Sequence, residues 1–368
     1  RWTAMGGADL GSARINWRAV RVRGLVRPQI AWGVSEMPSW DGHTAPFADA
    51  AGGVLAGSVA EAGFWRIGDI SQWVMVRGRS TDNPLLVILH GGPGSSATTL
   101  FRSFNASLEE SYTVIYWDQR GAGRSYSRSI PPASMTIDRF VADLDELVET
   151  LIARFGERRV VLLGHSWGSL VGVLYASRYP AKVAAYVGVG QVADMAASEA
   201  ASYAFALARA RERGHRGAIK QLLAIGPPPH AMKALATQRR WLMAMGGAFG
   251  PNLSLAKVIW RGFTGPEASV LDLVRLVRGS RFSLRLLFRE LLDANLQRDV
   301  RRLEAPVFFM LGRRDMQAVA SVAAAYFEVL EAPHKELIWF EASGHMAPFE
   351  EPELFNRLMV ETIRSFAC

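Results

Sequence analysis

The chain has 368 residues, of which 49% are apolar and 21% charged, proportions typical of a globular protein rather than a disordered one. This length allows one large domain with an insertion. No run of about 18 or more apolar residues occurs, so we predict no membrane span. The single cysteine, Cys368, cannot form an internal disulfide, and we predict a cytoplasmic protein.

The net charge of +8 is distributed unevenly along the chain. Residues 191–303 hold 18 Lys or Arg and 8 Asp or Glu, a net charge of +10, so the remainder carries a net charge of −2. A basic segment can bind nucleic acid. These residues are scattered along helical patterns, however, and form no recognised binding motif. We therefore predict solvated helix faces and no nucleic-acid partner.

The first part of the chain, residues 1–57, has weak periodicity and many Gly, Ala, Pro and Trp residues. We interpret it as an N-terminal extension and assign it no role. Regular structure is expected from about Phe64 onward.

The segments that follow alternate between strand and helix patterns. Continuous apolar runs predict strands that are buried on both faces, at 72–78, 85–89, 112–117, 160–163, 183–189, 306–311 and 336–340. Apolar residues at helical spacing predict helices over 136–155 and about 351–366. This alternation indicates an α/β protein with a mainly parallel central sheet flanked by helices.

One long segment interrupts the alternation. Residues 193–292 show several helical patterns, separated by Gly and Pro, and no convincing strand. We predict that residues 191–303 form an all-helical insertion, which we call the cap segment. Residues 58–190 and 304–368 then form the core.

The sequence Gly164-His165-Ser166-Trp167-Gly168 fits the pattern G-x-S-x-G between a predicted strand and a predicted helix. A sharp turn from strand to helix exposes its corner residue, and the flanking glycines let the backbones pass close together. Ser166 occupies this corner, so we predict that it is a catalytic nucleophile.

A serine hydroxyl needs a base to take its proton and a third group to orient that base. On such a sheet the order along the chain is Ser, acid, His. His345 is the histidine that follows a late strand, and Asp315 follows the strand before it. We predict that both complete a triad with Ser166. Asp315 could instead bond its own turn, and Asp194 is an alternative acid.

The tetrahedral intermediate of acyl transfer needs backbone N–H donors at its oxyanion. We predict that Trp167, directly after the nucleophile, supplies one donor. The second is expected from Gly91 or Gly92, in the turn after the strand at 85–89. A tight turn with a purely structural role is the alternative.

Three motifs together resemble the proline-iminopeptidase-like α/β-hydrolases. They are His90-Gly91-Gly92-Pro93-Gly94, the run from Trp117 to Ser125 (WDQRGAGRS) and the elbow motif 164–168, with Gly312 to Asp315 and Gly344-His345 matching the acid and base positions. The resemblance implies an α/β-hydrolase fold with an inserted helical cap, a triad of Ser166, Asp315 and His345, and no cofactor or metal. It implies no chemistry for Asp118 and Arg120, which belong to a neighbouring structural loop.

The chain departs from this family at two points. Its elbow has His165 where the family usually has glycine. The family captures a substrate ammonium with cap glutamates, and Glu199, Glu212, Glu267 and Glu290 cannot be matched to those positions. A net charge of +10 in the cap segment also disfavours a cationic substrate.

We therefore predict a cofactor-independent serine hydrolase that cleaves an ester or amide bond through an acyl-enzyme. Aminopeptidase and carboxylesterase or lactonase activities are both open, with a small molecule or short peptide as substrate. The alternative from another class is a non-catalytic ligand-binding protein on the same fold.

Overall fold

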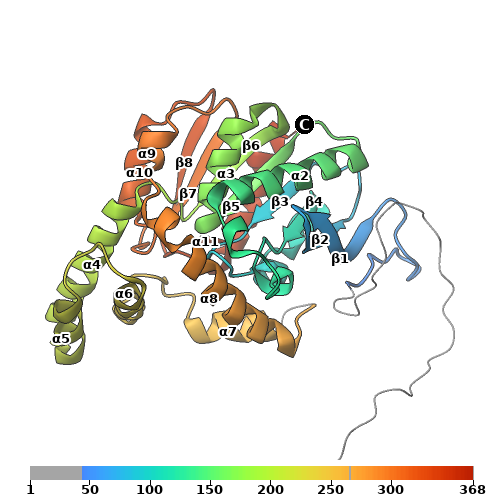
Figure 1. Cartoon of the computed structure of the whole chain (residues 1–368). Coiled ribbons are helices and arrows are strands. Elements are labelled where there is room, and N and C mark those ends of the chain that lie inside the picture. Colours follow the sequence, from blue (N-terminus) through green and yellow to red (C-terminus); the bar gives the residue numbers. More distant parts are fainter. Residues whose placement is uncertain (1–43, 265–266, 368) are drawn as a thin grey trace, which may run out of the picture. The chain divides into compact units, whose positions relative to one another are not determined.

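The computed structural model describes residues 44–264 and 267–367, so most of the predicted N-terminal extension lies outside the described residues. Figure 1 shows a central sheet with helices on both of its faces and a further group of helices at one end.

The sheet contains eight strands in the described part of the chain, and their spatial order is β1-β2-β4-β3-β5-β6-β7-β8. β1 pairs with β2 and β2 with β4 in antiparallel fashion, whereas all other neighbours are parallel. The strands are β1 (Val59–Ile67), β2 (Ile70–Gly78), β3 (Leu85–Leu89), β4 (Thr113–Trp117), β5 (Val160–His165), β6 (Val183–Val189), β7 (Val307–Gly312) and β8 (Lys335–Phe340). The expected start of regular structure near Phe64 was therefore late, because β1 begins at Val59.

Both faces of the sheet are covered by helices of the core. These are α1 (Thr98–Phe104), α2 (Ile137–Phe155), α3 (Trp167–Arg178), α10 (Ala320–Val329), α11 (Ala347–Glu350) and α12 (Pro352–Glu361). α2 begins where the Thr136 side chain accepts the N–H of Arg139, and it ends at Gly156 in the left-handed conformation. This helix confirms the one predicted over residues 136–155.

Alternate side chains of the strands enter two different hydrophobic cores. Leu162 of β5 packs in the core shared with α2, α3 and α10, whereas Leu163 packs in the core shared with α1 and α12. Both side chains are fully buried. A parallel strand covered on both faces needs apolar residues at consecutive positions, which explains the continuous runs in the sequence.

The described residues of the cap segment form six helices between β6 and β7. They are α4 (Met195–Glu212), α5 (Arg216–Ile225), α6 (Met232–Ala244), α7 (Leu255–Thr264), α8 (Val270–Leu292) and α9 (Leu296–Asp299). α4, α5 and α6 share a small hydrophobic cluster of their own. The division of the chain into extension, core and cap stays a prediction. Within residues 44–264 and 267–367, no helix is long and apolar enough to cross a membrane.

Candidate active site

Ser166 lies at the corner between β5 and α3. Its backbone has φ 54° and ψ −120°, a strained conformation for a residue with a side chain. Its N–H donates to the carbonyl oxygen of Val189 on β6, at 2.9 Å. A side chain at Gly168 would place its Cβ 2.0 Å from the carbonyl oxygen of Leu89, so only glycine allows α3 to approach β3 this closely. The turn therefore has the geometry that the motif predicts.

His345 and Asp315 lie in the loops after β8 and β7 and contact each other. His345 Nδ1 is 2.8 Å from Asp315 Oδ2, and both side chains are almost completely buried. Asp315 Oδ1 accepts the backbone N–H groups of Gln317 and Ala318, which hold the carboxylate in place. Asp315 thus bonds both its own turn and His345. The two interpretations of this residue, as a turn aspartate and as the partner of His345, are therefore compatible.

The second nitrogen of His345 is available for chemistry. With Asp315 ionised, Nδ1 donates to the carboxylate, so Nε2 carries the lone pair. Nε2 is buried and contacts no hydrogen-bond partner among the described residues. A buried acceptor without a partner is costly in a folded protein and calls for an explanation. A substrate or nucleophile proton at this position would supply one.

His345, from the loop after β8, packs against the loop after β6, which in turn contacts the elbow. A Cβ at Gly190 would lie 2.9 Å from the imidazole ring of His345, so this ring packs directly on the Gly190 backbone. Gly190 follows Val189, whose carbonyl oxygen accepts the Ser166 N–H. The structure therefore gathers Ser166, Asp315 and His345 at the carboxyl ends of β5, β7 and β8, as open α/β sheets arrange their sites.

Asp194, the alternative acid, is engaged elsewhere. Its Oδ1 accepts the N–H of Ala197 at 2.9 Å and caps the first turn of α4. Its Oδ2 accepts the Asn295 amide at 2.8 Å. The geometry pairs Asp315, and not Asp194, with His345.

The predicted oxyanion donors lie beside the nucleophile. A Cβ at Gly91 would be 3.2 Å from the Ser166 Cβ, so the turn after β3 touches the elbow. Trp167 is the first residue of α3, where a backbone N–H has no partner within the helix. The turn that carries Gly91 and Gly92 and the first residue of α3 therefore adjoin Ser166, and their N–H groups stay the predicted oxyanion donors.

A network that sequence reasoning missed holds this turn in place. His90 Nε2 accepts the backbone N–H of Gln119 at 3.1 Å, so His90 Nδ1 carries the proton and donates to the carbonyl oxygen of Gly91 at 2.8 Å. Gln119 Nε2 donates to the His90 carbonyl oxygen, and Gln119 Oε1 accepts the Trp167 indole N–H. Gln119 therefore links the turn that carries Gly91 and Gly92 to the elbow helix.

Glu350 plays a comparable part for the His345 loop and was also missed. Its carboxylate accepts the backbone N–H groups of Gly344 and Met346, on either side of His345, and that of Gly250 in the cap segment. Burial raises the pKa of Glu350 above its ordinary value, although these N–H groups oppose the rise. The one signal in the sequence was a carboxylate directly after an apolar stretch, Met346 to Phe349.

His165, the unusual elbow residue, is buried beside His345. Burial, and then the nearby His345, lower the pKa of His165 to about 4. Its Nε2 lies 2.9 Å from the carbonyl oxygen of His345 and must donate to it, because a carbonyl oxygen only accepts. A neutral His165 thus anchors the backbone of His345.

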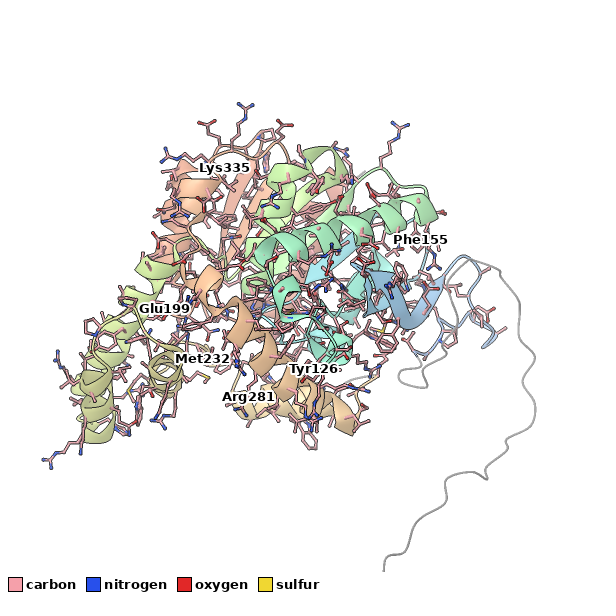
Figure 2. The ribbon with its side chains drawn as sticks, viewed as in Figure 1. Tyr126, Phe155, Glu199, Met232, Arg281 and Lys335 are labelled. Atoms are coloured by element: carbon pink, nitrogen blue, oxygen red, sulfur yellow. The ribbon has the colours of Figure 1, made fainter. Side chains whose placement is uncertain are left out.

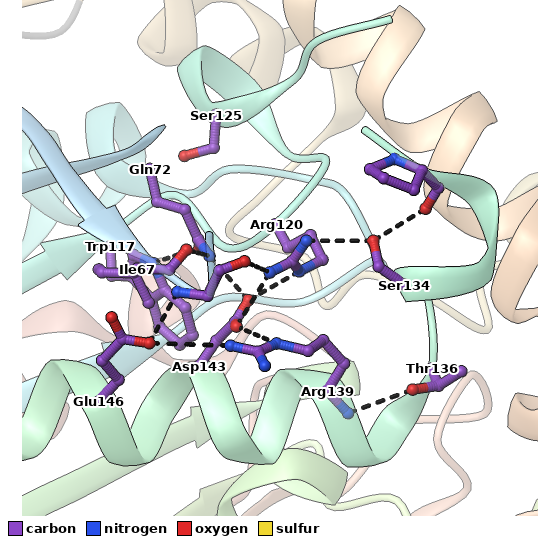
Figure 3. Close-up of polar contacts among 12 residues, drawn as sticks. Ile67, Gln72, Trp117, Arg120, Ser125, Ser134, Thr136, Arg139, Asp143 and Glu146 are labelled. Atoms are coloured by element: carbon purple, nitrogen blue, oxygen red, sulfur yellow. Dashed lines mark hydrogen bonds and ion pairs between the residues drawn. The ribbon is translucent and has the colours of Figure 1, made fainter. Parts of the chain in front are cut away.

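Asp118 and Arg120, for which the resemblance implies no chemistry, have structural partners. Figure 3 shows Arg120 bonded through two nitrogens to Asp143, which also accepts from Arg139 and Gln72. The side chains of Arg120 and Asp143 are 1% and 0% exposed. Asp118 accepts the N–H of Arg124 at 2.8 Å. These contacts join the loop after β4 to β2 and α2.

The glutamates of the cap segment are all engaged with other groups. Glu199 of α4 faces α6 (Figure 2), where it accepts from Gln238 at 2.9 Å and pairs with Arg239. Burial raises the pKa of Glu199, and the charge of Arg239 opposes this. The others form the contacts Glu212–Arg209, Glu267–Arg102 and Glu290 with the Ile137 N–H. Each of the four glutamates therefore already has a partner, and none is a free carboxylate that could receive a substrate ammonium.

A cavity of about 210 Å³ lies between the core and helices α7 and α8. Trp73 and Met75 of β2 and Asp118 and Arg124 line it on the core side. On the cap side it is lined mainly by aliphatic side chains, namely Leu255, Val258, Ile259, Leu273 and Leu276, together with the carboxylates Glu267 and Asp272. None of Ser166, Asp315 and His345 contributes to its lining. Among the described residues, no group of three or more His, Cys, Asp or Glu is arranged to hold a metal ion.

Comparison with known proteins was made on sequence and on structure. The family described as alpha/beta hydrolase fold matches residues 84–352. Probable aminopeptidase YbaC of Bacillus subtilis is 33% identical over 293 residues, which are 78% of this chain and 92% of that protein. A proline iminopeptidase of Saccharolobus solfataricus is 35% identical over 119 residues, 32% of this chain and 37% of that protein.

The solved structures show the same fold at lower sequence identity. A proline iminopeptidase-related protein of Thermus thermophilus has a TM-score of 0.57 and 21% identity, covering 84% of this chain and 99% of that one. At this identity the likeness concerns the fold alone.

Proposed function

The chain belongs to the α/β-hydrolase fold family and is a hydrolase, and from this premise we propose that Ser166, His345 and Asp315 are its catalytic triad. The reaction is the transfer of an acyl group from an ester or amide to Ser166 and then to water. No step requires a group other than the residues of this chain, the substrate and water.

In the first half of the reaction, Ser166 Oγ attacks the substrate carbonyl carbon while His345 Nε2 takes the hydroxyl proton. Asp315 holds the imidazole in the required tautomer and stabilises the imidazolium that forms. The N–H groups of Trp167 and of Gly91 or Gly92 stabilise the oxyanion. His345 then gives its proton to the leaving oxygen or nitrogen, and the acyl-enzyme remains.

In the second half, water attacks the acyl carbon and His345 Nε2 takes a proton from it. The tetrahedral intermediate collapses, the C–O bond to Ser166 breaks, and His345 returns the proton to Ser166 Oγ. The products are a carboxylic acid and the free enzyme.

One observation supports this proposal above the others. His345 is held by Asp315 through Nδ1, at 2.8 Å, and its Nε2 is buried without a partner among the described residues. His90, which holds the neighbouring turn, uses both of its ring nitrogens. The non-catalytic alternative gives no reason for a carboxylate-held imidazole that packs on Gly190, directly after the Val189 carbonyl oxygen that accepts the N–H of the strained Ser166.

Within this reaction class, the engaged glutamates favour esters, lactones and amides without a free ammonium group. Arg239 neutralises Glu199, and the cap segment carries a net charge of +10. A cationic amino terminus would meet repulsion rather than a free carboxylate. The second candidate is an aminopeptidase, favoured by the similarity to the B. subtilis relative.

Hydrolysis of p-nitrophenyl butyrate and of prolyl-naphthylamide by the wild type and by Ser166→Ala tests both levels of the proposal. We expect the wild type to cleave the ester with the higher kcat/KM, and the variant to lose activity by several orders of magnitude. Faster cleavage of the amide would select the aminopeptidase. Undiminished turnover by Ser166→Ala would refute the triad itself.

A further inference from the structure

Helices α7 and α8 present an apolar patch to solvent. More than half of the exposed large apolar side chains among the described residues lie on these two helices. Trp260 is 66% exposed, Leu271 55% and Val277 54%. We call the exposed residues Leu255, Ile259, Trp260, Leu271, Val274 and Val277 the α7–α8 patch. Exposed apolar side chains concentrated on two consecutive helices mark a site of interaction.

Arginines continue the patch along the same face of α8. Leu271 and Val274 are followed at helical spacing by Arg278, Arg281 and Arg285, all exposed. Arg281 lies on the side of α8 turned away from the sheet (Figure 2). The described residues offer none of these three arginines an ion-pair partner.

The acidic residues of α8 are turned away from this face. Asp272 pairs with Arg124 at 2.8 Å, and Glu290 accepts the Ile137 N–H at 2.8 Å. The charge that α8 offers to solvent beside the patch is therefore positive. Such a face complements an anionic surface.

The cavity between core and cap opens within this patch. Leu255, Ile259 and Leu273 line the cavity and are also 40–49% exposed. Its wall on the cap side is mainly aliphatic, and its two carboxylates, Glu267 and Asp272, are paired with Arg102 and Arg124. An apolar chain could therefore enter it from the patch. The cavity thus shares Leu255 and Ile259 with the patch, and the arginines share the face of α8 that carries Leu271 and Val274.

We propose that the α7–α8 patch docks on the surface of an anionic phospholipid bilayer. An amphipathic helix with Trp and aliphatic side chains on one side and arginines beside them lies at the lipid interface, where apolar groups enter the acyl region and cations meet phosphate. A nucleic acid would complement the arginines but would leave Trp260 and the aliphatic side chains without apolar partners. A lipid surface offers acyl chains to the apolar side chains and phosphate groups to the arginines.

Vesicle flotation of the full chain tests this proposal. We expect binding to vesicles of phosphatidylcholine with about one-third phosphatidylglycerol, weaker binding to phosphatidylcholine alone, and a decrease with added salt. Replacing Arg278, Arg281 and Arg285 by Gln should weaken binding about a hundredfold, because each arginine near such a surface contributes about fivefold. Replacing Arg158, Arg159 and Arg357 by Gln removes the same charge from exposed positions elsewhere and should change binding little.

A second measurement locates the contact. Brominated lipids should quench part of the tryptophan fluorescence, and Trp260→Phe should remove that part. Both sets of arginine substitutions are at exposed positions, so an unchanged Tm shows that the fold is retained. Because the patch contains no residue of the triad, Ser166→Ala should bind vesicles like the wild type whether or not the proposed chemistry is right.

Three results would overturn the proposal. The first is no binding to anionic vesicles. The second is an equal loss of binding with both sets of arginine substitutions, which would show attraction by net charge alone. The third is that the patch variants alter the oligomeric state or nucleic-acid binding but not flotation, which would assign the face to a second copy of the chain or to a nucleic acid.

Discussion

The imidazole Nε2 of His165 donates a hydrogen bond of 2.9 Å to the backbone carbonyl oxygen of His345. This contact ties the elbow to the loop of the proposed base. The contact requires a proton on Nε2, and His165 is otherwise neutral because burial, and then His345, lower its pKa to about 4.

A buried neutral histidine predicts that stability falls in acid. The unfolded chain takes up a proton on His165 below pH 6.5, whereas the folded protein does so only near pH 4. Between these values the free energy of unfolding should fall by about 1.4 kcal/mol per pH unit through this group. Urea unfolding at about pH 6.5 and about pH 5 should show a smaller loss for His165→Asn than for the wild type. Parallel losses in both proteins would contradict the assignment.

Gln119 should affect catalysis only by positioning the predicted oxyanion donors. Gln119→Leu removes the bonds to the His90 carbonyl oxygen and the Trp167 indole, so the predicted oxyanion donors lose their alignment. We expect kcat to fall about tenfold to a hundredfold, less than for loss of a donor itself, with KM nearly unchanged. Gln221→Leu is the matched control, because Gln221 is exposed on α5 and its Oε1 also accepts a tryptophan indole N–H. A rise in KM with constant kcat would instead indicate a role in substrate binding.

The buried ion pair of Arg120 and Asp143 should matter for stability (Figure 3). Arg120→Met leaves Asp143 buried with only part of its compensation, which should cost about 3–5 kcal/mol in the free energy of unfolding. Arg154→Met breaks the exposed pair with Glu61 and should cost at most about 1 kcal/mol. Urea titration of both variants measures the difference, and similar costs would show that burial does not govern these pairs.

The choice between two acids can be tested by a pair of isosteric substitutions. Asp315→Asn should lower kcat by about 10⁴-fold, because the amide favours the wrong tautomer of His345. Asp194→Asn should leave kcat within a few-fold, since Asp194 caps α4. A large loss of kcat in Asp194→Asn and a small one in Asp315→Asn would mean that Asp194, after β6, is the acid.

Much of the fold could be predicted because its signals are local. Parallel strands covered on both faces carry continuous apolar runs, as in β5, and the elbow motif directly follows that strand. Asp315 and His345 could be proposed because both follow late strands in the order such enzymes keep. The expected all-helical character of residues 193–292 also agrees with the helices found there.

The supporting contacts could not be predicted, because each joins segments far apart in the sequence. Gln119 reaches His90 and Trp167 only through the register of β3, β4 and β5. Glu350 meets Gly250 only because the cap segment lies against the His345 loop. The pairing of Glu199 with Arg239 depends on how α4 and α6 pack. Such contacts follow from tertiary structure, which residue patterns do not encode locally.

Labelling with a fluorophosphonate tests the central claim most directly, because this reagent forms a covalent bond with a serine that a neighbouring base activates. We expect one adduct per chain, on the peptide that contains Ser166. Ser166→Ala should not be labelled, and His345→Gln should be labelled far more slowly. An adduct at another residue, or equal labelling of the wild type and Ser166→Ala, would contradict the proposed triad.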